Sequence, residues 1–207
     1  MKVSALVSTY NSSAYLAGCL EDLINQTLYQ KNLLEIIVID SGSEENEGEV
    51  VRLFQKQYTN IKYLRTENRK SLYEAWNQGI QDAEGLYLCN ANTDDRHDEE
   101  CLERLSNALD ENGKISLAYG NIDKVFSLEP SVKDEKKTPC PSQDFFPASL
   151  FVHYPYGAQP MWRAEIHRKV GFFNSKYEVL GDYEFALRLV SKGLISAFVP
   201  EAKGEML

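Results

Sequence analysis

Short apolar runs alternate with segments of helical periodicity along the first half of this 207-residue chain, and this alternation restricts the fold more than any other feature. The apolar runs predict buried strands at residues 3–8, 34–40, 61–64 and 86–89. Apolar residues recur at helical spacing between them, which predicts helices at residues 13–27, 50–58 and 71–82. Strands that alternate with helices pair in parallel through right-handed crossovers. We therefore predict an α/β fold with a doubly wound, mostly parallel sheet and helices on both faces.

After residue 95 the pattern becomes less regular. We predict helices at 99–110, 165–170 and 181–192, strands at 115–126 (interrupted at 121–123) and 195–199, and an irregular segment at 155–163. Residues 127–144 contain three prolines and many charges, which indicates a long mobile loop. A chain of this length can bury one substantial core, so we expect a single domain over residues 1–207, with halves at about 1–95 and 96–207.

The charge of the chain restricts its partners. Lys and Arg number 22 and Asp and Glu number 31, so the formal net charge is 22 − 31 = −9. An acidic chain repels nucleic-acid phosphates, and we therefore expect no nucleic-acid partner. No run approaches the ~18 consecutive apolar residues of a membrane span, so we expect no integral membrane segment. The chain begins directly with a predicted strand and its four cysteines form no CxxC pair, from which we expect a cytoplasmic protein without a signal peptide.

Polar side chains follow three of the predicted parallel strands, at residues 8–10, 40–43 and 92–95. The carboxyl ends of parallel strands share one edge of a sheet, where ligands of open α/β folds bind. The third group, Asn92-Thr93-Asp94-Asp95, offers the oxygen ligands that Mg²⁺ and Mn²⁺ prefer. Two alternatives remain open: Asp94 or Asp95 caps the helix that begins near residue 99, and Asp40 is a turn carboxylate that binds backbone N–H groups.

Two nucleotide-binding classes are excluded by the loop after the first strand. Its sequence, STYNSS, lacks the GxGxxG of dinucleotide-binding folds, and the chain contains no GxxxxGK[ST] phosphate loop. A nucleotidyltransferase would need a glycine-rich, basic phosphate loop here, and STYNSSAYLAG contains no basic residue.

Five motifs occur in the order found in family 2 glycosyltransferases: STYN, VIDSGS, SLYEAWNQGI, NTDD and GDYEFALRL. The segment GAQPMWRAEIHRKVGFF is similar to the acceptor-side half of that family, and the resemblance covers residues 3 to about 200. It implies the GT-A fold and an inverting transferase that moves a sugar from a nucleotide-diphospho-sugar to an acceptor hydroxyl with a divalent cation, Mn²⁺ or Mg²⁺. The first half would bind the donor and the second a carbohydrate, lipid-linked or protein acceptor. Relatives commonly act in polysaccharide biosynthesis, and we include a homodimer among the expected partners.

The resemblance also assigns site residues by their match to the motifs. The residues expected at the nucleotide-sugar are Thr9, Tyr10, Asn11, Asp40, Ser43, Asn68, Arg69, Asn77, Asn92 and Asp94. Asp94 and Asp95 are expected at the metal, Asp182 as the general base, and Trp162 and Arg163 at the acceptor.

Two positions depart from the family pattern. Asn92 stands where the common motif has its first Asp, and Gly181 replaces the Glu that precedes the base. Alternatives therefore stay open: the chain is a non-catalytic nucleotide-sugar-binding module or a truncated domain of a larger transferase, Asp182 caps the last helix, and Trp162 and Arg163 pack between the two halves.

Overall fold

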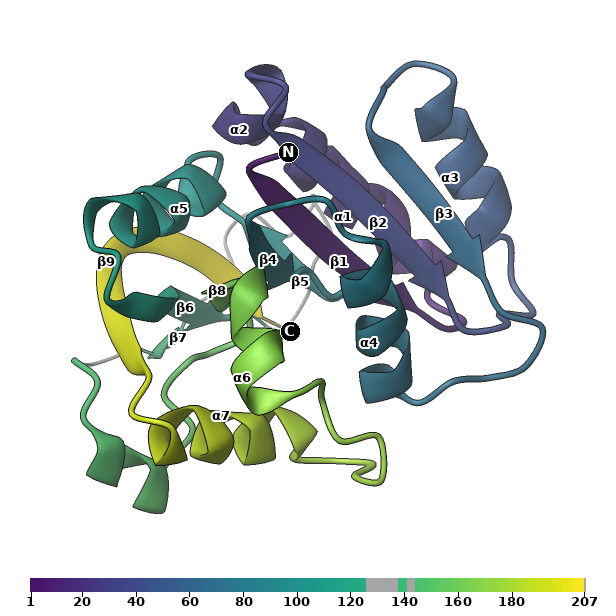
Figure 1. The fold of residues 1–207 in the computed structure, drawn as a ribbon. Helices are drawn as coiled ribbons and strands as arrows, with labels where there is room; N and C mark the ends of the chain where they lie inside the picture. Colours follow the sequence, from purple (N-terminus) through teal and green to yellow (C-terminus); the bar gives the residue numbers. More distant parts are fainter. Residues whose placement is uncertain (126–137, 141–143, 207) are drawn as a thin grey trace.

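The computed structural model describes residues 1–125, 138–140 and 144–206 (Figure 1). Its strands are β1 Val3–Thr9, β2 Leu34–Asp40, β3 Ile61–Arg65, β4 Tyr87–Asn90, β5 Asp95–His97, β6 Ile115–Lys124, β7 Thr138–Cys140, β8 Met161–Arg163 and β9 Ile195–Met206. Its helices are α1 Ser13–Ile24, α2 Thr27–Gln30, α3 Glu47–Gln55, α4 Leu72–Asp82, α5 Cys101–Glu111, α6 His167–Val170 and α7 Gly181–Ser191, with 3₁₀ turns η1 Pro147–Phe151 and η2 Ala164–Ile166.

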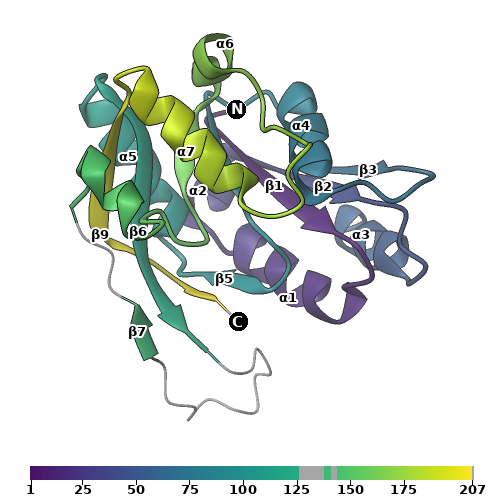
Figure 2. The same ribbon diagram turned by 90° about the horizontal axis from the view of Figure 1, so that it is seen from below.

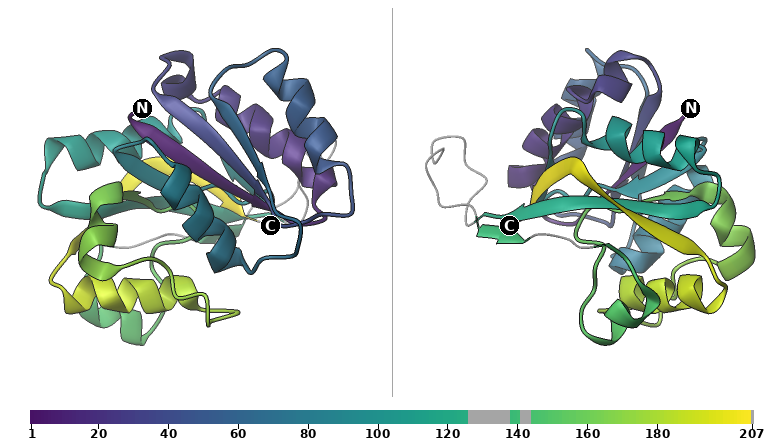
Figure 3. Two further views of the ribbon diagram at one scale, coloured as in Figure 1. Left: turned by 45° about the vertical axis from the view of Figure 1, so that its right-hand side comes forward. Right: turned by 90° about the vertical axis from the view of Figure 1, so that its left-hand side faces the viewer.

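One sheet joins both halves of the chain. Within the described residues its order is β3-β2-β1-β4-β8-β6-β9-β5, with β7 paired to β6. The strands β1 to β4 are parallel to one another, as the strand–helix alternation predicts. Antiparallel pairs enter where β8 joins β4 and β6, and β9 then curves alongside β6 in parallel (Figure 3).

Helices cover both faces of the sheet, which confirms the predicted architecture. Alternate residues of β1 point to opposite faces, with Val3, Ala5 and Val7 on one and Leu6 on the other. The first face packs against α1, α3 and α5, and the second against α4 and α7. Figure 2 shows α1 and α3 on one side of the N-terminal strands and α4 on the other. Both faces are therefore buried, which explains the nearly continuous apolar run of β2.

The structure corrects several predicted elements. The helix expected at 13–27 ends at Ile24, and a separate short helix, α2, follows. The strand β6 runs without the interruption expected at 121–123, because a register shift between Tyr119 and Asn121 absorbs the irregularity. The last strand continues to Met206 instead of ending at residue 199. Residues 161–163, expected to be irregular, form β8.

The loop predicted at 127–144 is described only in part. Residues 138–140 form the edge strand β7, whereas 126–137 and 141–143 lie outside the described residues and leave that prediction untested. Across the described ranges, no helix combines the length and apolar character needed to cross a bilayer.

Candidate functional site

A cavity of about 900 Å³ opens at the carboxyl ends of β1 and β4, beside the N-terminus of α4. Most of the residues that line it carry polar groups, and they come from four segments: Ser8, Thr9, Tyr10, Ser12 and Tyr15; Ser41; Arg69, Lys70, Ser71, Leu72 and Ala75; and Asn92, Thr93 and Asp94. Glu178, in the segment between α6 and α7, completes the rim. This is the edge of the sheet at which the sequence predicted a ligand site.

The three residues Asn92, Asp94 and Asp95 differ in their surroundings. Asp94 is exposed in the cavity and, among the described residues, its carboxylate has no hydrogen bond or ion pair. Asn92 joins the strand ends: its Oδ1 accepts from Ser8 Oγ at 3.3 Å and its Nδ2 donates to Asp95 Oδ2 at 3.2 Å. Asp95 is buried and does not line the cavity; burial, and then the charge of Asp94, raise its pKa to about 8.

The capping alternative for these acids is wrong. The N-cap position of α5 is Glu100, and no side chain caps the helix. Asp94 is therefore free of that structural role.

A divalent cation fits this arrangement only together with a bound diphosphate. The described residues contain no group of three or more His, Cys, Asp or Glu that could enclose a metal by themselves. Mg²⁺ in proteins is commonly held by one or two carboxylates together with phosphate oxygens and water. Asp94 supplies one such carboxylate at the cavity, whereas Asp95 is buried beneath it and does not line the cavity.

Positive charge lies on another side of the same cavity. The guanidinium of Arg69 lies 4.3 Å from the centre of the Tyr10 ring, and Lys70 follows it. The helix α4 begins directly afterwards with a capping box in which Ser71 and Glu74 exchange hydrogen bonds. Two cations and a helix N-terminus are suited to a bound anion such as a diphosphate.

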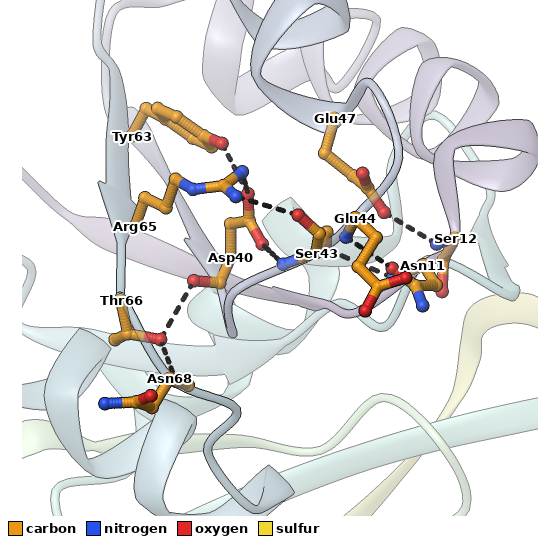
Figure 4. Close-up of polar contacts among 10 residues, drawn as sticks. All are labelled: Asn11, Ser12, Asp40, Ser43, Glu44, Glu47, Tyr63, Arg65, Thr66 and Asn68. Atoms are coloured by element: carbon orange, nitrogen blue, oxygen red, sulfur yellow. Dashed lines mark hydrogen bonds and ion pairs between the residues drawn. The ribbon is translucent and has the colours of Figure 1, made fainter.

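Asp40 does not line the cavity, because its carboxylate is used inside the protein (Figure 4). It is fully buried and accepts hydrogen bonds from Ser43 N at 2.8 Å, Tyr63 Oη, and Arg65 Nη1 at 2.9 Å. Burial alone would raise the pKa of Asp40, but the hydrogen bonds from Tyr63 and Ser43 and the charge of Arg65 hold it below its ordinary value. These are the contacts expected from the turn alternative.

Asn11 and Ser43 connect the loops that follow β1 and β2. Asn11 has a positive φ of 48°, its N–H donates to Ser43 Oγ at 3.1 Å, and its Oδ1 accepts from Glu44 N at 2.8 Å (Figure 4). Asn68 contributes its backbone carbonyl, which accepts from Thr66 Oγ1 at 2.7 Å. None of the three residues Asn11, Ser43 and Asn68 lines the cavity.

Asn77 joins α4 to the second half of the chain. Its Nδ2 donates to the carbonyl of Phe173 at 2.8 Å, and its Oδ1 accepts from the N–H of Phe173 at 2.9 Å. Both ends of the amide are thus occupied by one backbone residue. Figure 2 shows the segment between α6 and α7 running past α4, where this contact lies.

Asp182, the expected base, is half-buried at the start of α7 and is also reached from α4. The hydroxyl of Tyr73 donates to Asp182 Oδ1 at 3.1 Å. The N-cap residue of α7 is Leu180, in a left-handed conformation with φ of 66°, and no side chain caps the helix. The alternative that Asp182 is an N-cap is therefore wrong.

The close packing of Tyr73 also explains the departure at Gly181. A Cβ atom at position 181 would lie 2.6 Å from Tyr73 Cε2, which is closer than real Cβ contacts. A glutamate at this position is incompatible with the present position of the tyrosine ring, and the glycine permits the contact between Tyr73 and Asp182.

Trp162 and Arg163 are engaged in packing. Trp162 is buried and its Nε1 donates to His167 Nε2 at 2.9 Å. Arg163 donates to the carbonyls of Ile115, at 2.8 Å, and Leu109, so it holds the end of α5 against β6. Neither residue lines the large cavity, as the packing alternative predicts.

Comparison with known proteins identifies the family. The sequence profile described as "Glycosyl transferase family 2" matches residues 4–173. The chain belongs to glycosyl transferase family 2. This confirms the family to which the order of the five motifs pointed.

One relative and two solved structures show how far the similarity extends along the chain. Glycosyltransferase GlyG of Streptococcus pneumoniae is 36% identical over 109 residues, which are 53% of this chain and 35% of GlyG. The structure of S. aureus TarS 1–349 with UDP-GlcNAc superposes with a TM-score of 0.79 at 18% identity, covering all of this chain and 59% of that one. Mannosyltransferase PcManGT from Pyrobaculum calidifontis, in complex with GDP-Man and Mn²⁺, gives a TM-score of 0.73 at 15% identity over 99% of this chain and 56% of its own.

These comparisons establish the fold as GT-A, the fold expected from the motifs. The chain spans between about a third and three-fifths of the length of these three proteins.

Among the residues assigned from the family 2 motifs, the cavity brings together Thr9, Tyr10, Arg69, Asn92 and Asp94. The other residues assigned from the motifs do not line the cavity: Asn11, Asp40, Ser43, Asn68, Asn77, Asp95, Trp162, Arg163 and Asp182.

Several residues of the site were not expected from the sequence, among them Lys70, Tyr73 and Glu178. Lys70 could have been included on its charge and its position beside Arg69. Tyr73 and Glu178 approach the site only through packing between α4 and the segment before α7, for which the sequence contains no local signal.

Proposed function

We propose that this chain transfers a sugar from a nucleotide-diphospho-sugar to a hydroxyl group of an acceptor, with inversion at the sugar carbon. The cavity at the carboxyl ends of β1 and β4 carries this proposal, because it combines the free carboxylate of Asp94 with the cations Arg69 and Lys70. That combination suits a diphosphate that shares a divalent cation with the protein. Family membership, and the UDP-GlcNAc and GDP-Man complexes of two structural neighbours, support the same class of donor.

Each group would act on a different part of the reaction. Asp94 would hold a divalent cation, and Arg69 and Lys70 would lie beside the diphosphate of the donor. When bound, the cation neutralises the negative charge that develops on the leaving nucleoside diphosphate. The Mn²⁺ of the PcManGT complex supports this choice of cofactor.

Asp182 removes the proton from the acceptor hydroxyl as that oxygen attacks the sugar carbon from the side opposite the diphosphate. Tyr73 donates to one carboxylate oxygen and so fixes its orientation.

The acceptor is a carbohydrate, lipid-linked or protein hydroxyl that approaches from the second half of the chain. The free, buried cysteines Cys19, Cys89 and Cys101 support a reducing, cytoplasmic location.

The test is calorimetric titration of UDP and GDP, with Mn²⁺ and with a chelator, into the wild type and Asp94→Ala. We expect at least one nucleotide to bind with Mn²⁺, and both the chelator and the substitution to weaken that binding by about tenfold or more, because each removes one partner of a charge pair. Asp98→Asn is the matched control, since Asp98 is an exposed acid of the same region outside the cavity. Undiminished binding after both treatments would refute the metal role of Asp94.

A second measurement separates a transferase from a non-catalytic binding module. A transferase releases nucleoside diphosphate from its matched nucleotide-sugar, slowly into water and faster with acceptor. Tight donor binding with no release under either condition would contradict the proposed reaction.

A further inference from the structure

A second, much smaller chamber lies beside Asp182, between α4, α7 and the sheet. Its volume of about 20 Å³ is close to what a single water molecule requires. Its wall includes Trp76 from α4, Asn90 from the end of β4, and Asp182 from α7. The remaining side chains are aromatic or aliphatic; two of them, Tyr154 and Tyr156, carry hydroxyl groups, and that of Tyr156 is bonded to Ser196. The chamber is therefore largely apolar, with a few polar groups contributed by α4, β4, α7 and the segment before β8.

Two of these polar groups are buried without a partner. Trp76 and Asn90 are only 4% and 6% exposed, and neither Trp76 Nε1 nor Asn90 Oδ1 has a hydrogen-bond partner among the described residues. The orientation of the Asn90 amide is fixed, because its Nδ2 donates to the carbonyl of Ala158 at 3.0 Å. One unpartnered atom is thus a donor and the other an acceptor. A buried polar atom without a partner costs free energy, so such a pair calls for a ligand.

We propose that this chamber binds one water molecule, which links Trp76 and Asn90 to the carboxylate of Asp182. The water accepts from the indole N–H of Trp76, donates one hydrogen to Asn90 Oδ1 and donates the other to Asp182. Three partners are typical of a buried water. The indole N–H of Trp76 and Asn90 Oδ1 form no hydrogen bond with each other. A water molecule between them can satisfy both, because it accepts one hydrogen bond and donates another.

The consequence is that Trp76 and Asn90 are positioning residues for the base, a role that rests on the proposed function of Asp182. With Tyr73 donating to Oδ1, the bound water is a second donor to the carboxylate, from the side of the chamber. Two donors from different directions hold the carboxylate in one orientation, and general-base catalysis depends on such alignment.

The binding of water is tested by NMR on the unaltered protein, which requires no activity. The chain has two tryptophans and therefore two indole N–H signals. Trp162 is the internal control, since its side chain also lines the chamber but its N–H is already bonded to His167, whose ring protons identify that signal. We expect a direct cross-relaxation peak to water at the Trp76 indole proton and none at that of Trp162.

The absence of the water peak at Trp76 would overturn the proposal. That result would indicate that the indole N–H instead faces one of the rings packed against it, Tyr73 or Phe173.

The role in catalysis is tested with two variants that remove the same number of non-hydrogen atoms from the chamber wall. Trp76→Phe removes the N–H donor, whereas Leu117→Ala removes only apolar atoms. Both should lower thermal stability. We expect Trp76→Phe alone to lower kcat by about tenfold, with the KM for the nucleotide-sugar unchanged, because only the alignment of the base is affected. Equal kcat values for the two variants, per folded enzyme, would refute the positioning role.

If the wild type transfers no sugar, the proposed function fails while the NMR result on the water still stands. The two proposals can therefore be refuted separately.

Discussion

The substitution Asp40→Asn tests whether this residue serves the nucleotide or the fold. The match to the family motif predicts Asp40 at the nucleotide-sugar, but in the structure its carboxylate accepts from Ser43, Tyr63 and Arg65 inside the protein. An asparagine keeps one oxygen, which can still accept from Ser43 N, and presents an NH₂ group where Tyr63 and Arg65 now donate. The hydroxyl of Tyr63 can turn to accept from that NH₂ group, whereas the guanidinium of Arg65 has no acceptor atom. The substitution therefore removes a charge-assisted hydrogen bond while nearly preserving the shape of the side chain.

The expected loss of stability follows from these contacts. A hydrogen bond to a charged group contributes about 1.5–3 kcal/mol, and Arg65 is half exposed and keeps its bond to the carbonyl of Ser43, so we expect a loss of about 2 kcal/mol. For a chain of this size that corresponds to a fall in Tm of roughly 4–8 °C. Asp40→Ala should cost more, about 3–4 kcal/mol, because the N–H of Ser43 also loses its acceptor.

The dependence on pH gives a second check. The pKa of Asp40 is lower in the folded protein than its ordinary value of 3.8. A carboxylate with a lowered folded pKa stabilises the protein above the unfolded value and loses that contribution as the pH falls through the folded value. The stability difference between wild type and Asp40→Asn should therefore be constant from about pH 8 to pH 5 and narrow only below about pH 3.8.

The assay is urea denaturation across this pH range, combined with nucleotide titration. Glu44→Gln is the control, because Glu44 is an exposed carboxylate of the same loop and contributes only its backbone N–H to the network. A variant Asp40→Asn with wild-type stability and weakened nucleotide binding would refute the structural role and support the direct contact expected from the family motif.

Two further predictions concern the start of α7. Asp182→Asn should lower kcat by about 10²–10⁴-fold and leave the donor affinity and the Tm unchanged. The Tm should hold because the amide oxygen can still accept from Tyr73 and the residue caps no helix. Normal turnover of the variant would exclude Asp182 as the base. Gly181→Ala should destabilise the protein by about 1–3 kcal/mol, because its methyl group meets the Tyr73 ring. Tyr73→Leu in the same chain should recover part of that loss of stability. If the double variant is no more stable than the sum of the two single losses predicts, the clash is contradicted.

Sequence periodicity predicted the first half of the fold well and the second half less well. The strand at 34–40 agrees with β2, and the helix at 71–82 differs from α4 only by its cap, Ser71. These elements are buried on regular faces, so each carries a repeating apolar pattern. The strand β8, by contrast, has three residues and follows Pro160, and it is a strand because β4 and β6 flank it. No three-residue pattern can reveal such pairing.

The positions of site residues that directly follow a predicted strand could be predicted from the sequence. The positions of those held by contacts between distant segments could not. Asp94 follows a buried strand, so its position at the sheet edge was expected. The inward orientation of Asp40 depends on Arg65, its register partner on β3, and on Tyr63 of the same strand, more than twenty positions away. The contact between Tyr73 and Asp182 spans 109 positions and needs Gly181. Such contacts are properties of the folded chain.

The segment at 174–180 is attached at both ends to one helix. Asn77 of α4 holds Phe173, immediately before it, and Tyr73 of α4 holds Asp182, just after it. An insertion between two such anchors displaces neither of them, and doubling the length of a flexible loop costs only about 0.6 kcal/mol of closure entropy. Over evolutionary time this segment can therefore change in length and sequence while α4 keeps Phe173 and Asp182 in place, so the rim of the cavity at Glu178 can diverge among descendants without moving Asp182.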